Sequence, residues 1–448
     1  MKLNKFFFKK FFLVCGCLFL ALIAIFAIAY TVLNIKWGRD LRCELDKLKA
    51  SGVPMTIRDI APPSLPPAKN ASVEYQQIFS LMTDGTSSMN NSGGNSMDLK
   101  ELYTLSHSKK ETVDDFENQC SANAVRIREI LGKDSFRQIF ELCQKAAAKP
   151  GMNFNLPYED GPSLLMPHLS SLREISRLIC LKAEMEMLEG QRDKAWETIL
   201  TGLKLSLHSK TEPLLISQLI YYACSNIYLD FISQNLSRYG IRQDQAEKIV
   251  SELAPERTAY AQSMKKAIDG ESVCFGGWVF ERILSGSLSS SEFCMIAGNK
   301  FAGSYFMPLL FLYRPFAKKD YQEYLKIMGG YRAEYNQPYY RTSADSMLND
   351  DEMLLNHLPK YCILTRMIAP SLHGLRLKTA KIETRSQEIR ILLALEEYKN
   401  LNGAYPEKLA LLAPKFLPEI PVSDLTGLPF GYSKGNGGYE ISGSASER

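Results

Sequence analysis

The chain has 448 residues, and at about 100 to 200 residues per domain this length allows two or three domains. Hydrophobic residues make up 46% and charged residues 23% of the chain, a globular balance that argues against wholesale disorder and against a multi-span transporter. The 53 Lys and Arg exceed the 49 Asp and Glu by four, and four lysines (Lys2, Lys5, Lys9 and Lys10) lie at the N-terminus before any acidic residue. The rest of the chain is therefore neutral, and we expect no nucleic acid among its partners.

An uncharged segment after these lysines predicts a membrane-spanning helix. Phe11–Ile35 contains no charged residue, and a helix of this length covers the hydrocarbon core of a bilayer. The lysines on its N-terminal side place the N-terminus in the cytoplasm by the positive-inside rule. Residues 1–36 are thus expected to be the cytoplasmic lysines and a transmembrane helix, with the lipid bilayer as the partner of residues 11–35. The expected location is the bacterial inner membrane, crossed once, with the body in the periplasm.

A cleaved signal peptide is the alternative for this segment. Ala27-Ile28-Ala29 fits a small-x-small cleavage pattern, and the protein would then be secreted after cleavage near Ala29. The apolar run is longer than the roughly 7 to 15 residues of a signal peptide's apolar region, which favours the anchor. Under both interpretations the rest of the chain is exported across the membrane.

Residues 37–69 are expected to form a proline-rich linker beside the membrane. Leu41–Ser51 is a short charged helical stretch, and prolines follow it at positions 54, 62, 63, 66 and 67. Proline fixes φ and removes a backbone donor, so we expect an extended segment that holds the body away from the bilayer.

Residues 70–370 are expected to form a helical body. A polar stretch at Thr86–Met97 predicts a loop, and Val113–Ala148 regains the helical spacing of apolar residues. The clearest hairpins lie at 170–254, where apolar residues recur at i, i+3 and i+4. Gly270–Arg341 mixes glycines, serines and aromatics, and predicts helices joined by long loops. The helices predicted within 170–254 are Ser170–Gly190, with Ser171 and Glu174 as a capping box, about Arg192–Ser209, Pro213–Ser233 and Gln243–Leu253.

The third of these helices is apolar nearly all round, which predicts a central, buried position. A second membrane span is the alternative, but Gln218, Asn226 and Asp230 interrupt the apolar run and favour the core helix. Ala183, Gly190, Ala195 and Leu203 follow a pattern in which this part of the chain resembles a single tetratricopeptide unit. The resemblance implies a stack of helices and does not imply peptide binding.

Residues 371–448 are expected to form a long helix with a small α+β head. Apolar positions from Leu375 to Leu395 predict a helix over Ser371–Lys399, Pro406 suits the start of a short helix, and Phe430–Ser442 alternates as a hairpin does. With the Pro421 to Asp424 turn, this order resembles the C-terminal head of type II secretion pseudopilins and of uncharacterised bacterial single-span exported proteins. Phe11–Ile35 lacks the glutamate of a prepilin-peptidase site, so the resemblance implies the fold of the head and not assembly into a pseudopilus.

The sequence contains few candidates for chemistry, and it predicts no catalytic, cofactor-binding or metal-binding residues and no cofactor. Asp350, Asp351, Glu352 and His357 cluster, but their spacing favours a solvated acidic turn over a metal site. Ser263 and Lys266 match S-x-x-K without its partner motifs, which favours a chance match on an exposed amphipathic helix.

Two groups of tyrosines could form either a core or a binding groove, and the cysteines could be either free thiols or disulfides. Core packing is favoured over a binding groove for Tyr221, Tyr222 and Tyr228, whereas the two readings are even for Tyr335, Tyr339 and Tyr340. Eight cysteines lie beyond the apolar segment, too few for a disulfide scaffold, and buried thiols are favoured. The local candidates for disulfides are Cys120 with Cys143 and Cys274 with Cys294.

The predicted fold class is mainly α, with an N-terminal transmembrane helix, an exported body of helical hairpins and a small α+β C-terminal head. The favoured function is a membrane-anchored envelope protein with a scaffold or interaction role and a protein partner. The alternatives are an envelope hydrolase with dispersed acidic residues and an accessory component of a secretion or pilus-like machine. Two carboxylates of raised pKa facing a cleft would favour the hydrolase, and an exposed apolar groove would favour the scaffold.

Overall fold

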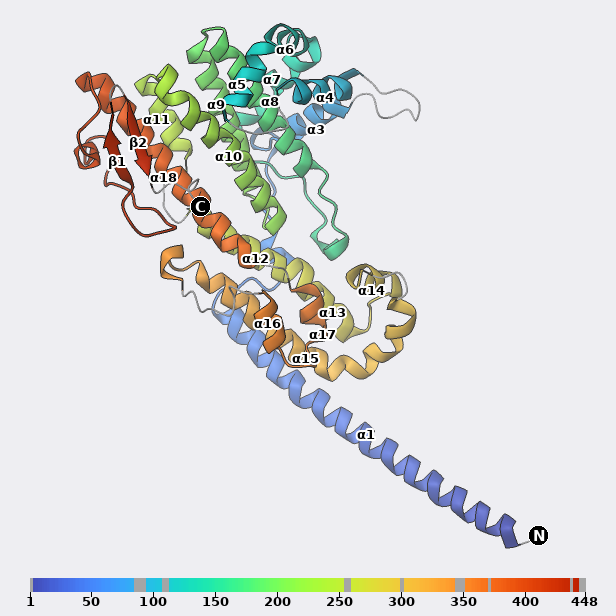
Figure 1. Cartoon of the computed structure of the whole chain (residues 1–448). Helices are drawn as coiled ribbons and strands as arrows, with labels where there is room; N and C mark the ends of the chain where they lie inside the picture. Colours follow the sequence, from blue (N-terminus) through green and yellow to red (C-terminus); the bar gives the residue numbers. More distant parts are fainter. Residues whose placement is uncertain are drawn as a thin grey trace.

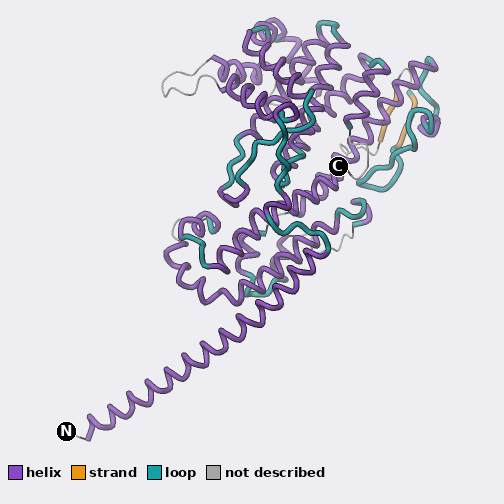
Figure 2. Tube along the Cα trace, turned by 180° about the vertical axis from the view of Figure 1, so that it is seen from behind, coloured by secondary structure: helices purple, strands orange, loops and turns teal. Residues whose placement is uncertain are grey.

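The computed structural model describes residues 3–83, 94–106, 113–253, 259–298, 302–342, 351–369, 372–435 and 438–442. The protein is mainly helical, and one long helix projects from a helical body (Figure 1). Figure 2 shows the same arrangement from behind, with the strands confined to one side of the body. The mainly helical fold class is therefore confirmed.

The projecting helix is α1 (Leu3–Ala50), and its N-terminal part is uncovered by the body (Figure 1). Within the described residues it is the single helix long and apolar enough to cross a membrane. The charged stretch expected at Leu41–Ser51 continues the apolar helix without a break, because Leu41 is buried and Leu45 packs against the core of the body.

The proline-rich segment lies against the body and does not act as a spacer. It contains the short helices α2 (Ile57–Ile60) and η1 (Pro67–Lys69). The Asn153 side-chain amide donates to the carbonyl of Pro63 over 3.0 Å, and the Asn70 backbone pairs with Gly151. The expectation of a free extended spacer is wrong, because the unpaired backbone carbonyls of the prolines find donors on the body.

The N-terminal half of the body is a stack of helices. α3 packs on α7, α7 on α9, and α9 on α8, so that successive layers share one apolar core. Thr86–Met97, expected as a loop, lies outside the described residues up to 93, and α4 begins at Gly94. The bounds are α3 (Ser72–Thr83), α4 (Gly94–Ser106), α5 (Val113–Ala122), α6 (Ala124–Leu131), α7 (Asp134–Ala147) and η2 (Tyr158–Ser163).

The predicted hairpins are present as α8 (His168–Leu188), α9 (Arg192–Ser209), α10 (Leu215–Tyr239) and α11 (Gln243–Glu252). The prediction of a capping box at Ser171 is wrong, because α8 begins three residues earlier, at His168. His168 and Leu169 are buried there, and this tertiary contact extends the helix. α10 runs beyond the expected end and stops at Gly240, whose φ of 67° suits glycine.

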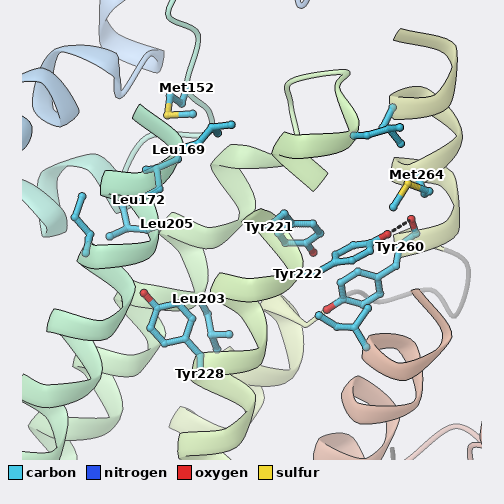
Figure 3. Close-up of a cluster of buried hydrophobic side chains, with 14 of the residues drawn as sticks. Met152, Leu169, Leu172, Leu203, Leu205, Tyr221, Tyr222, Tyr228, Tyr260 and Met264 are labelled. Carbon is cyan, nitrogen blue, oxygen red and sulfur yellow. Dashed lines mark hydrogen bonds between the residues drawn. The ribbon is translucent and has the colours of Figure 1, made fainter. Parts of the chain in front are cut away.

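α10 is the central helix of the body, as its apolar sequence predicts. It contacts α8, α9, α12 and α18, and buried residues occur on all its sides. Tyr221 and Tyr222 meet Tyr260 of α12, with the Tyr221 and Tyr260 rings stacked at 5.5 Å (Figure 3). The core-packing interpretation of the first tyrosine group is therefore confirmed.

The second half of the body begins with α12 (Ala259–Glu271), which continues through a π-helical segment, η3 (Ser272–Gly277), into α13 (Trp278–Ser285). The prediction of long loops in Gly270–Arg341 is wrong within the described residues, because successive helices there are joined directly or by short turns. The remaining helices here are α14 (Ser290–Ile296), α15 (Ala302–Glu334), η4 (Tyr339–Arg341), α16 (Asp351–His357) and α17 (Ile363–Ile368).

The C-terminal region is built on α18 (His373–Asn402), which ends at Gly403 with φ of 79°. An antiparallel hairpin, β1 (Gly431–Lys434) and β2 (Tyr439–Ser442), pairs Tyr432 with Ile441, as the alternation predicts. The short helix expected at Pro406 is wrong, since a 3₁₀ turn, η6 (Leu409–Leu412), starts three residues later. The Pro406 carbonyl accepts instead from the Tyr432 hydroxyl over 2.6 Å.

All ten cysteines are free thiols. The candidate disulfides Cys120 with Cys143 and Cys274 with Cys294 are therefore absent. Cys120, Cys143 and Cys274 are buried, where a thiol packs as a small apolar side chain, and burial raises the pKa of Cys143 to about 12.

Candidate functional site

A groove opens between the first turns of α8 and α10. α8, α9 and α10 follow one another as antiparallel neighbours, so α8 and α10 run parallel and their N-terminal turns lie side by side. The groove has a volume of about 520 Å³. It is lined by Met166, Leu169, Ser170, Arg173, Glu174, Arg177, Ile216 and Ile220.

The walls of the groove are apolar and partly exposed. Ile216 is 44% exposed. It lies in the first turn of α10, the helix that otherwise forms the centre of the core. Ile220 lies one turn further on the same face, and Leu165 projects beside the groove with 80% of its surface exposed. An apolar face of this kind at a helix junction is suited to an apolar segment of a partner.

Two arginines and one glutamate, Arg173, Glu174 and Arg177, give the rim of the groove an excess of positive charge. Arg173 and Arg177 are one turn apart on α8, and neither forms an ion pair with another described residue. The Arg177 guanidinium lies 6.0 Å from the ring centroid of Tyr103 of α4, which orients it. The N-terminal ends of α8 and α10 add partial positive charge here, so the groove favours a carboxylate on its ligand.

The base of the groove is held by a buried polar cluster. His168 Nε2 lies 2.8 Å from Glu212 Oε1, and the Ser217 hydroxyl donates to Glu212 Oε2 over 2.7 Å. A nucleophilic serine needs the histidine next to its hydroxyl, with the carboxylate behind the histidine. Here the carboxylate lies between the two, so the cluster joins the two helix ends and does not form a catalytic triad.

A second buried cluster joins α18 to the C-terminal region. Glu383 of α18 and Asp424 are 3% and 2% exposed, and their carboxyl groups share a hydrogen bond. Burial, and then the charge of Asp424, raise the pKa of Glu383 well above its ordinary value. Two carboxyl groups this close in the core are stable as a pair that shares a proton.

Backbone donors and one arginine complete this cluster. Glu383 Oε1 accepts from the Ala261 backbone N–H over 3.1 Å, and the Tyr339 N–H donates to Asp424 Oδ2 over 3.3 Å. Arg376 is buried beside them, 4.8 Å from the ring centroid of Tyr335. The pair therefore ties together α12, η4 and the turn at Asp424, and both of its side chains are buried.

The two residues of the S-x-x-K match lie on different sides of α12. Ser263 donates to Gln218 Oε1 over 2.7 Å and is buried, so the S-x-x-K match lies on a buried face and not, as expected, on an exposed helix. Lys266 is exposed, and the two side chains point to different environments.

The acidic turn expected around Asp351 is wrong, because Asp351–His357 is the helix α16. Asp350 lies outside the described residues, and His357 Nδ1 bonds the Met353 carbonyl over 2.8 Å. The second aromatic group has a structural role. Tyr340 packs on Gly427, and its N–H donates to the Asp424 carbonyl over 3.2 Å. In the described part of the chain no cluster of His, Cys, Asp or Glu has the make-up of a metal site.

Comparison with known protein families, with curated proteins and with solved structures finds no match to this chain. The resemblances to pseudopilin heads and to a tetratricopeptide unit therefore stay predictions from the sequence.

Proposed function

We propose that this protein is a membrane-anchored envelope protein whose helical body binds a protein partner through the groove between α8 and α10. α1 is the anchor, with its N-terminus in the cytoplasm and the body in the periplasm of a bacterial inner membrane. Residues 371–448 form a small α+β head on the body. A secreted form cleaved near Ala29 is the alternative for the anchor.

The observation that carries this proposal is the combination of apolar walls and a basic rim in one open groove. Ile216 supplies exposed apolar surface, while Arg173 and Arg177 outnumber Glu174 on the rim and leave it with an excess of positive charge. The partner segment is therefore apolar and carries carboxylates. The hydrolase alternative needs carboxylates in a cleft, and Glu383 and Asp424 are closed to solvent.

The test measures peptide binding to the full chain in detergent micelles by fluorescence anisotropy. A library of amphipathic helical peptides with acidic polar faces is compared with the same peptides carrying Lys in place of Glu. We expect the acidic set to bind and the lysine set to fail. The double variant Arg173→Glu with Arg177→Glu should reverse this preference, and Ile216→Asp should weaken both sets.

Arg137→Glu is the matched control, since Arg137 is an exposed arginine on another helix. It should leave the binding of acidic peptides unchanged. Equal binding of acidic and lysine peptides, or binding that survives both groove variants, would mean that the groove is not the binding surface.

A further inference from the structure

An apolar face of α15 lies beside the membrane end of α1. Leu309, Phe311, Leu312 and Phe316 are 54%, 57%, 44% and 38% exposed. Leu309, Leu312 and Phe316 are spaced three and four residues apart and therefore share one face of the helix, while Phe311 lies at the edge of this face toward α1. Figure 1 shows α15 curving along the end of the body from which α1 projects. Pro315 lies within this helix and accounts for part of the curvature.

The contacts between α15 and α1 set the height of this face along α1. The Tyr30 hydroxyl donates to the Phe311 carbonyl over 2.8 Å, and the two rings stack at 5.6 Å. Tyr30 lies inside the apolar segment that ends at Ile35, about 7 Å before that end at the rise of an α-helix. If α1 spans a bilayer, Phe311 therefore lies below the level of the headgroups.

Aromatic and basic residues mark the boundary just above this level. The Trp37 and Phe316 rings meet at 5.2 Å, and tryptophan is typical of the membrane interface. Lys318 donates to Asn34, and Lys319 forms an ion pair with Asp40 over 3.1 Å. Apolar residues thus face the level of the acyl chains, and basic residues face the level of the phosphates.

We infer that the N-terminal half of α15 is a second membrane contact, an interfacial helix that buries its apolar face among the lipids of the leaflet on the body side. This inference rests on the proposed anchoring by α1. The occupant of the face is phospholipid, because the face continues the exposed surface of the span and ends at a band of cations. The body is then held flat on the membrane by α15 as well as attached through α1.

Site-specific photo-crosslinking of the full chain tests the inference. Benzoylphenylalanine replaces Phe311, Leu20 or Leu401 in separate variants, each reconstituted in vesicles of phosphatidylethanolamine and phosphatidylglycerol that carry a radiolabelled acyl chain. Leu20 is an exposed residue of the apolar part of α1, and Leu401, 55% exposed at the far end of α18, is the matched control for Phe311. We expect labelled lipid on the variants at 20 and 311, with at least tenfold less at 401.

The outcomes separate this inference from the proposed function. Lipid at 20 but not at 311 would overturn the interfacial helix and keep the anchor. No lipid at 20 would overturn the anchor itself. A crosslinked dimer at 311 would identify a second copy of the chain as the occupant and would equally overturn the inference.

Discussion

The buried carboxyl pair of Glu383 and Asp424 makes the stability of the fold depend on pH. Burial and the neighbouring Asp424 raise the pKa of Glu383 in the folded protein, so the pair of carboxyl groups retains a proton there. In the unfolded chain Glu383 ionises near its ordinary value of 4.5. The folded state therefore binds more protons above that pH, and the contribution of Glu383 to stability is greatest in acid and decreases as pH rises.

We predict that Glu383→Gln removes this pH dependence. The amide keeps a donor for Asp424 and does not titrate, so the variant should gain stability relative to the wild type as pH rises from 5 to 9. The gain is at most about 1.4 kcal/mol per pH unit. Chemical denaturation of the full chain in detergent across this pH range measures it. Glu419→Gln, at an exposed position of the same region, is the control, and parallel pH profiles for wild type and Glu383→Gln would contradict the prediction.

Tyr405 is the second residue on which the C-terminal region depends. Its ring is buried and meets Tyr439 edge-on at 4.8 Å, and its hydroxyl donates to Glu396 Oε1 over 2.5 Å. These contacts join the turn after α18 both to the hairpin and to α18 itself.

We predict that Tyr405→Ala costs about 3 to 5 kcal/mol, because it leaves a cavity and unpairs the buried Glu396. Tyr405→Phe keeps the ring and should cost about 1 to 3 kcal/mol. Limited proteolysis of Tyr405→Ala should cut first after Asn400 while 170–254 stays intact. Simultaneous loss of the whole body would show instead that the Glu383 and Asp424 pair couples the head to the body as one cooperative fold.

At the scale of elements, close approach of backbones positions α12 against the start of α10. A Cβ on Gly270 would lie 1.6 Å from the Pro213 carbonyl oxygen, so only glycine fits without a backbone shift. A Cβ on Gly276 would likewise meet the ring of Tyr324 at 2.1 Å. Gly276 thus lets the π-helical segment approach α15, and Gly270 lets the end of α12 approach the residues before α10.

We predict that Gly270→Ala destabilises the body by about 1 to 3 kcal/mol or more, because the atom that it meets is backbone and cannot rotate away. Gly329→Ala is the control within another helix, where nothing lies within 4 Å of the new Cβ. It should be neutral or stabilising by up to about 1 kcal/mol through helix propensity. Thermal unfolding followed by far-UV circular dichroism compares the two, and equal melting temperatures would contradict the close approach.

At the scale of the whole molecule, the proposed orientation of α1 predicts the compartment in which the body lies. We predict that an alkaline phosphatase reporter fused after Ser51 is active, because the N-terminal lysines keep the preceding end in the cytoplasm. If a reporter that is active only in the cytoplasm were active at the same position, α1 would have the opposite orientation. N-terminal sequencing of the membrane fraction tests processing, since a mature N-terminus at Tyr30 would indicate a cleaved signal peptide.

The sequence by itself determined the elements whose signal is local. The uncharged run of α1, the bounds of α9 and α11, the central position of α10 and the hairpin at Gly431–Lys434 and Tyr439–Ser442 all follow from periodicity and turn residues. These features depend on neighbours a few residues apart, which a sequence displays directly.

The tertiary structure alone decided what depends on distant partners. Glu383 and Asp424 are far apart in the chain, and no local pattern indicates that a charged residue of α18 faces a turn of the head. α8 begins earlier than the sequence predicts, because His168 contacts Glu212. The groove forms because the N-terminal ends of α8 and α10, which α9 separates in the sequence, lie side by side. The sequence predicted helices within Gly270–Arg341 but not the contact between Phe311 of α15 and Tyr30. Burial and pairing across the fold set these features, and the free energy of such contacts is larger than the local preferences from which a sequence is interpreted.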